Sequence, residues 1–258
     1  MFERLIDKGF DVALLHHAQA IVQVDMPDAA SDIEDALLSL EIPVTELVAG
    51  GGGEAPVTQR LRRTLADFGW SKRNITIGKT IQISKESEPI QVEAVSHEID
   101  HVKSFGEGKW SAALETEWNN KDPFYDRDLE NFKRLHTEGV ISLGGLITRG
   151  ASLQANMRGI IARFADDREI NSFADLLPYG YDPTARQKRQ ITQRAEKLEN
   201  FREAWVSWFV SDKYGEATTH WRKLQDRVAR GVGNPCPLVL IGIPEAVVTF
   251  DYSAATEL

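Results

Sequence analysis

The chain has 258 residues, of which 42% are hydrophobic, so it is a folded globular protein rather than a disordered one. Residues 1–54 hold eleven acids and two bases and account for the whole net charge of −9, which argues against loose, non-specific coating of nucleic acid. The sequence has no apolar run long enough to span a membrane, and its charged N-terminus excludes a signal peptide. The single cysteine, Cys236, excludes an internal disulfide and a cysteine-based zinc site, and we expect a cytoplasmic protein.

The first quarter of the chain predicts helices. Residues 12–25 fit either a strand or a helix, and residues 28–40 predict an amphipathic helix with acids in its first turns. Gly50 to Gly53 form a glycine loop, which is not a P-loop because no Gly-Lys-Ser/Thr follows it. Residues 56–68 predict a second helix that begins near a proline.

The rest of the chain alternates between strand and helix patterns. Strands are predicted at 75–83, 92–103, 111–118, 140–148 and 238–243, with a turn at 105–109. Helices are predicted at 126–138, 186–210 and 217–230. This pattern indicates an α/β (α+β) fold with a central mixed sheet flanked by helices.

Three acidic residues stand close together in two neighbouring predicted strands. Glu115 and Glu117 project from the same face of one strand, because side chains alternate along it. If that strand pairs with the preceding one as a hairpin, Asp100 approaches Glu115, and two carboxylates at that distance repel each other unless a cation lies between them. We therefore expect Asp100 and Glu115 to hold Mg²⁺, and Glu117 to orient or deprotonate a water molecule or to bind a second metal.

Long segments of the chain resemble the BglII-type restriction endonuclease family, over about residues 40–245. The most specific is ALETEWNNKDPFYDRDLENFKRL (113–135), and others are GGGGE with TQRLRRTL (50–65), HEIDHVK (97–103), GVISLGGLITRG (139–150) and TTHWRKL with CPLVLIGI (218–243). The resemblance implies the nuclease core of the PD-(D/E)XK superfamily. In that core Asp100 is the metal-binding Asp, Glu115 the second ligand, and Glu117 takes the third position, which is most often Lys.

The resemblance also implies an activity and an organisation. It implies a Mg²⁺-dependent type II restriction endonuclease that cuts double-stranded DNA, with Mn²⁺ able to replace Mg²⁺. It implies a homodimer, since palindromic sites match a two-fold axis, and a cognate DNA methyltransferase as a functional partner rather than a stable complex. We expect one domain over residues 1–258, with an acidic elaboration at 1–45 and the nuclease core at 46–245.

Further site residues are expected around the acids. Glu54 follows the glycines and is a candidate active-site acid, or else a simple acid at a helix N-terminus. The candidates for DNA contact are Asn119 and Asn120, which could read an adenine edge or cap a turn, Lys121 for a phosphate, Arg149 for a base or phosphate, and His220, Arg222 and Lys223 at the start of a late helix.

Three other functions fit parts of the pattern. A nuclease for repair or for modified DNA would use the same fold, and a non-catalytic DNA-binding module would not need the three acids. His97-Glu98-Ile99-Asp100-His101 matches the HExxH motif of zinc proteases, which requires a helix. In a β-rich segment the two histidines would lie about 13 Å apart by strand rise, too far to share one zinc ion.

Overall fold

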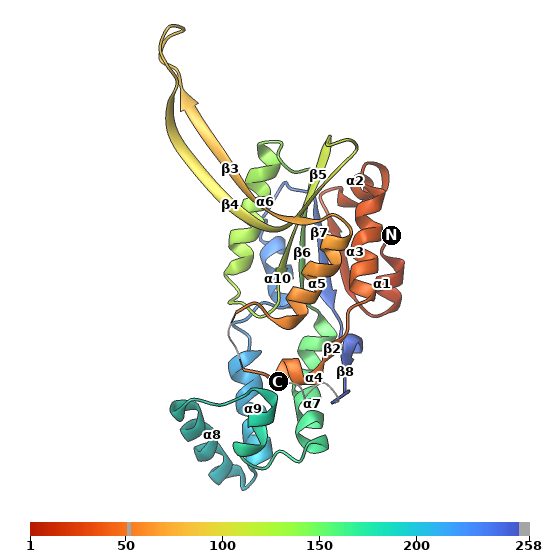
Figure 1. Cartoon of the computed structure of the whole chain (residues 1–258), viewed down its shortest axis with the longest axis vertical. Helices are drawn as coiled ribbons and strands as arrows, with labels where there is room; N and C mark the ends of the chain where they lie inside the picture. The colour runs from red at the N-terminus through yellow and green to blue at the C-terminus, as the bar shows by residue number, and fades with distance from the viewer. Residues whose placement is uncertain (51–52, 253–258) are drawn as a thin grey trace.

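The computed structural model of the chain describes residues 1–50 and 53–252. Gly51 and Gly52 of the predicted glycine loop lie outside the described residues. The molecule is elongated (Figure 1): a two-stranded arm extends from one end, α8 and α9 form the other end, and the main sheet lies between them. None of the described helices is long and apolar enough to cross a membrane.

The N-terminal part of the chain packs helices against the sheet. The segment 12–25, which fitted either a strand or a helix, contains both, because His16 and His17 adopt positive φ angles of 51° and 65° and separate β1 from α2. The predicted helices at 28–40 and 56–68 are confirmed as α3 and α5, each with a proline at its start. The elements are α1 (Glu3–Asp7), β1 (Asp11–Leu15), α2 (Ala18–Val24), α3 (Pro27–Leu38), β2 (Ile42–Pro43), α4 (Val44–Val48) and α5 (Pro56–Asp67).

The main sheet has six strands in the order β1-β7-β6-β5-β4-β3. Strands β5, β6 and β7 are parallel, and β1, β4 and β3 are antiparallel to their neighbours, so the predicted mixed sheet is confirmed. The remaining strands are β3 (Ser71–Ile81), β4 (Ile90–Phe105), β5 (Trp110–Glu117), β6 (Leu143–Arg149), β7 (Leu238–Ile243) and β8 (Val248–Thr249), which pairs with β2.

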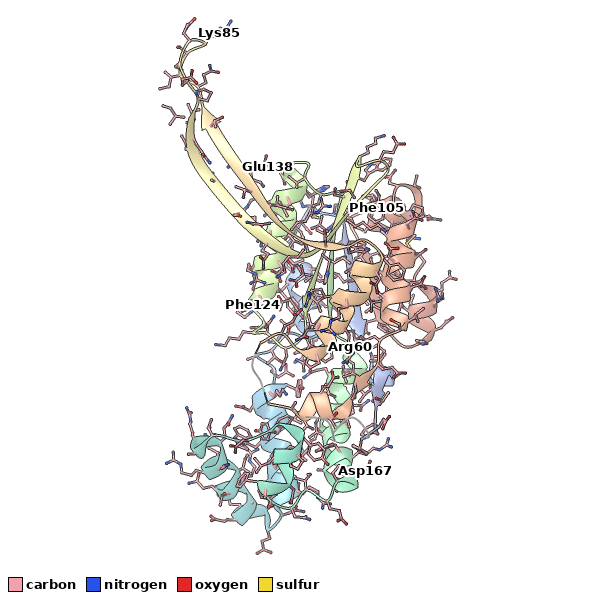
Figure 2. The ribbon with its side chains drawn as sticks, viewed as in Figure 1. Arg60, Lys85, Phe105, Phe124, Glu138 and Asp167 are labelled. Carbon is pink, nitrogen blue, oxygen red and sulfur yellow. The ribbon has the colours of Figure 1, made fainter. Side chains whose placement is uncertain are left out.

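The outer halves of β3 and β4 form the arm. Lys85 marks its tip in Figure 2, far from the body of the molecule. The side chains of Ile81, Ile83, Ile90 and Val92 are all more than half exposed there. The arm therefore lies outside the hydrophobic core, and only the inner halves of these strands help to build the site.

The helices of the second half depart from prediction at two places. They are α6 (Phe124–Thr137), α7 (Ala151–Asp167), the 3-10 turn η1 (Ala174–Tyr179), α8 (Ala185–Leu198), α9 (Phe201–Lys213), α10 (Trp221–Ala229) and the 3-10 turn η2 (Glu245–Val247). The single helix predicted at 186–210 is wrong. Glu199 has φ 52°, and the Asn200 side chain accepts from the Glu203 N–H, so one helix ends and another begins between them.

Helix α7 was not predicted. Its N-terminus is stabilised by a residue distant in sequence, since Asp11 of β1 accepts a hydrogen bond from the Ala151 N–H at 2.7 Å. That contact exists only because β1 lies at the edge of the sheet beside β7.

The two faces of the sheet carry separate cores. Leu114 packs with the residues of α3, α5 and α7, whereas its neighbour Ala113 packs with α6 and α10. Helix α6 lies very close to β6, because a Cβ added at Gly144 would stand 2.8 Å from the Phe132 ring. This close packing brings the polar end of α6 against the carboxyl end of β5.

Candidate active site

The β4–β5 hairpin brings Asp100 and Glu115 together. The turn between the strands is tight, with positive φ at Gly106, Glu107 and Gly108. His101 pairs with Leu114, so Asp100 stands beside Glu115. The Asp100 backbone N–H donates to Glu115 Oε2 at 3.3 Å.

Glu115 is a buried acid without a cationic partner. Its exposed fraction is 5%, and no ion pair reaches it within residues 1–50 and 53–252. Burial, followed by the charges of Asp100 and Asp128, raises its pKa to about 10. Carboxylate oxygens are the donors that a hard divalent cation prefers, and such a cation would remove the repulsion.

Glu117 lies two residues further on the same face and is also buried, with an exposed fraction of 3%. Asn120 Nδ2 donates to its Oε2 at 2.5 Å, and Arg127 Nη2 donates to its Oε1 at 3.2 Å. Burial, followed by the charge of Asp128, raises the pKa of Glu117 to about 8. That value is suited to proton transfer near neutral pH.

Asp128 is a fourth acid that our reading of the sequence missed. It lies on the buried face of α6, with Tyr125 and Phe132, and is 1% exposed. Arg127 Nε donates to its Oδ1 at 2.7 Å, so Arg127 bridges Asp128 and Glu117. An acid at a core position of an amphipathic helix was the signal that could have identified it.

The acids form linked pairs rather than one closed cage. In the described part of the chain, no three His, Cys, Asp or Glu side chains converge closely enough to form a ready-made metal site. Asp100 contacts Glu115, and Glu117 lies beside Asp128.

A cleft of about 1010 Å³ opens beside these acids. Glu115 and Glu117 are not among the lining residues, but each contacts one that is: Glu115 contacts Asp100, and Glu117 contacts Asn120. The polar residues that line the cleft include Glu54, Arg62, Lys72, Asp100, Thr116, Asn119, Asn120 and Lys213. Both predicted metal ligands are therefore in or next to the cleft.

Glu54 faces the cleft from the loop before α5. It stands two residues before the helix begins, is exposed, and pairs with Arg62 at 3.2 Å. The structure places Glu54 and Asp100 in the same cleft, although Glu54 does not contact Glu115.

Lys213, which our sequence reading did not select, is one of three basic residues that line the cleft, with Arg62 and Lys72. Its Nζ donates to the carbonyl oxygens of Leu47 and Ala49, and within the described residues it makes no ion pair. Burial lowers its pKa to about 8. The end of α9 therefore presents to the cleft a half-buried ammonium group that has no ion-pair partner among the described residues.

The predicted DNA-contact residues after β5 lie beside those before α10. Lys121 is exposed, and its backbone forms an isolated antiparallel β-bridge with Thr218. The Asn120 N–H donates to the Thr219 hydroxyl, and the Thr219 N–H donates to the Asn120 carbonyl. Asn119 and Asn120 line the cleft. The structure thus joins two loops that are about a hundred residues apart in the sequence.

Arg149 and His220 are buried within this junction. Arg149 is 0% exposed, and its guanidinium donates to the Thr219 carbonyl and the Thr218 hydroxyl at 2.7 and 2.6 Å. His220 is 2% exposed, and burial lowers its pKa to about 4. Arg149 therefore holds the loop before α10, and neither side chain faces solvent. Arg222 is exposed and pairs with Glu216, and Lys223 pairs with Asp122 at 3.5 Å.

The HExxH segment lies on β4 and not on a helix. His97 contacts Arg134 of α6, whereas His101 pairs with Leu114, whose side chain packs on the other face of the sheet. A bulge between Ile99 and Val102 produces this reversal. The zinc-protease geometry is absent from this described segment.

Comparison with known proteins gives one strong match. The family model described as "Restriction endonuclease BglII/BglIII" matches residues 10–243, a span that includes every candidate residue above. Among curated proteins, none matched the chain.

Proposed function

The chain belongs to the BglII/BglIII restriction endonuclease family, and from this premise we propose that it is a type II enzyme that hydrolyses double-stranded DNA with Mg²⁺. Mn²⁺ would replace Mg²⁺, because the same oxygen ligands suit both ions. A nuclease of this kind needs acidic ligands next to a space that admits a phosphodiester.

The observation that carries the proposal is the contact of Asp100 with Glu115 at the edge of the cleft. Asp100 and Glu115 would hold the ion, and when bound it would neutralise charge on the scissile phosphate. The raised pKa of Glu115 supports this role, since a buried acid beside two others is stabilised by a bound cation.

Glu117 is proposed to orient the attacking water and to accept its proton at a carboxylate oxygen. Arg127 and Asn120 each donate to this carboxylate and fix its direction. Asp128 holds Arg127 and is proposed as a positioning residue. Glu54, which shares the cleft with Asp100, is proposed as a further acid near the ion.

The walls of the cleft supply contacts for DNA in this proposal. Lys213 would meet a phosphate, as would Lys72 after leaving Glu98, and Asn119 would approach a base edge. Asn120, whose Nδ2 holds Glu117, would approach a base edge with its amide oxygen. Lys121, Arg222 and Lys223 would meet phosphates outside it, after Arg222 leaves Glu216 and Lys223 leaves Asp122. Arg149 would act by holding the loop before α10, and His220, which is buried at the start of that helix, would not contact DNA directly.

The organisation expected from the sequence remains part of the proposal. We propose a homodimer in which each subunit cuts one strand, because a two-fold dimer matches a palindromic site. A cognate methyltransferase would protect host DNA without forming a stable complex.

Plasmid digestion tests the proposal. We expect discrete fragments with Mg²⁺, none with EDTA, and none from a Glu115→Ala variant. Glu130→Gln is the matched control, because Glu130 is exposed on α6 and pairs only with Lys133. Sequencing fragment ends from methylated and unmethylated plasmid separates a restriction enzyme from a nuclease for modified DNA. Plasmid DNA that stays uncut after incubation with the native protein and Mg²⁺ would refute the catalytic proposal.

A further inference from the structure

Helix α8 has a composition that packing does not explain. It contains five basic residues and one acid, and only Ile191 is buried. A capping box formed by Thr184 and Gln187 stabilises its start. The helix is thus well formed, yet most of its surface is exposed and positively charged.

The basic side chains without partners fall on one side of α8. Arg186, Arg189 and Lys197 are separated by three and eleven residues, which at 3.6 residues per turn places them on one face, away from Ile191. All three are exposed, and none forms an ion pair in the described ranges. We call these three residues the basic stripe.

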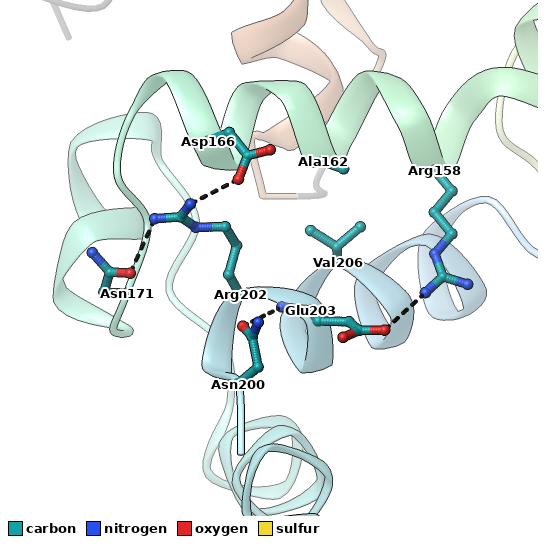
Figure 3. Close-up of a pocket in the computed structure, with 8 residues that line it drawn as sticks. All are labelled: Arg158, Ala162, Asp166, Asn171, Asn200, Arg202, Glu203 and Val206. Atoms are coloured by element: carbon teal, nitrogen blue, oxygen red, sulfur yellow. Dashed lines mark hydrogen bonds and ion pairs between the residues drawn. The ribbon is translucent and has the colours of Figure 1, made fainter. Parts of the chain in front are cut away.

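The other side of the same helical layer is neutralised. Figure 3 shows the groove between α7 and α9, where Arg202 pairs with Asp166 at 2.7 Å and Arg158 with Glu203 at 3.7 Å. Arg202 also donates to the Asn171 side chain at 3.0 Å. Bases on this side are paired within the protein, so the charge of the basic stripe is a particular property of α8.

The basic stripe starts near the catalytic cleft and runs away from it. Arg186 lines a surface groove with Ser211 and Asp212, which directly precede Lys213 of the cleft. From Arg186 to Lys197 the helix rises about 17 Å, or about five phosphates along a DNA strand at 3.4 Å spacing.

We propose that the basic stripe binds the phosphate backbone of duplex DNA that flanks the cleavage site. This rests on the proposed function, because it takes the occupant of the cleft to be DNA. Three exposed positive charges without ion-pair partners, in a row of about 17 Å that starts near the cleft, favour a continuous polyanion that leaves the cleft over α8. The stripe adds affinity and leaves the chemical step unchanged.

Salt-dependent binding tests the stripe without requiring cleavage. The variant carries Arg186→Gln, Arg189→Gln and Lys197→Gln. The matched control carries Arg4→Gln, Arg158→Gln and Arg163→Gln, which remove three equally exposed but paired bases. Binding is measured with a random-sequence duplex of about 40 base pairs in EDTA. We expect the slope of log association constant against log salt concentration to become less negative by about 2.7 in the variant only.

Cleavage provides the second readout. At the plasmid site mapped above, we expect the variant to lose the preference for long over short flanking DNA, with kcat unchanged. If variant and control have equal salt slopes and cleavage depends equally on flanking DNA length in both, the proposal for the basic stripe is overturned, even if the native protein cuts DNA. A reduced slope with no cleavage by the native protein would sustain the stripe and refute the nuclease. Equal melting temperatures confirm that the variants fold.

Discussion

Two buried acids on opposite faces of the sheet have opposite surroundings. Asp32 of α3 accepts hydrogen bonds from Lys103 Nζ at 2.6 Å and Trp70 Nε1 at 2.9 Å. Glu115 of β5 accepts one from the Asp100 N–H, lies near the Asp100 and Asp128 carboxylates, and forms no ion pair among the described residues. Both are less than a tenth exposed. Burial of an acid alone therefore does not single out a candidate site, whereas burial without an ion-pair partner makes Glu115 a candidate.

The largest expected effect is on cleavage by Glu115→Gln. Removing the charge that holds the ion should lower the cleavage rate by about 10³-fold or more, equivalent to about 4 kcal/mol. The rate is measured on plasmid DNA with saturating Mg²⁺, and Glu130→Gln should retain native activity. If the variant cuts within tenfold of the native rate, Glu115 is not part of the catalytic site.

Glu117→Gln should have the next largest effect, because the amide keeps a hydrogen-bonding group but accepts no proton. We expect a loss of about 10²-fold in kcat. In the native enzyme, a pKa near 8 makes activity rise with pH through this range, as the carboxylate form appears. The rise should be absent from the variant's pH profile. An unchanged rate and profile would limit Glu117 to orienting water.

Asp32→Asn tests the paired acid. The change leaves the Lys103 ammonium without its counter-charge, and we expect a loss of about 2 kcal/mol in the free energy of unfolding, measured by urea denaturation. Asp35→Asn on the same helix is the control, since its exposed pair with Arg4 should contribute less than about 1 kcal/mol. Equal losses in the two variants would end the contrast between paired and unpaired acids.

Glu115→Gln should have the opposite, smaller effect on stability. The pKa of Glu115 is 4.5 in the unfolded chain and about 10 in the folded protein. The stability that its protonated form contributes is therefore fully present below pH 4.5 and is lost as the pH rises towards 10. Gln does not titrate, and in EDTA at pH 8 the variant should be more stable by about 1 kcal/mol, or about 2–4 °C in Tm.

The pH series supplies the check on this stability prediction. The advantage of the variant should shrink as the pH falls to 4.5, and Mg²⁺ should stabilise the native protein alone. A variant that is less stable than the native protein at pH 8 in EDTA would show that Glu115 has a partner of opposite charge.

The sequence by itself determined strands β3 to β7 of the main sheet, helices α3, α5, α6 and α10, and the approach of Asp100 to Glu115. Period-two and period-3.6 patterns reflect local geometry, and a short hairpin turn leaves little freedom of register between its strands. The three acids and the family resemblance could therefore be recognised from the sequence alone.

Only the tertiary structure decided which charges have partners. The capping of α7 by Asp11, the burial of Arg149 and the cleft position of Lys213 all depend on contacts between residues more than sixty positions apart. Asp128 joins the site because α6 packs closely on β6. Partners and desolvation are properties of assembled surfaces, and local periodicity contains no information about them.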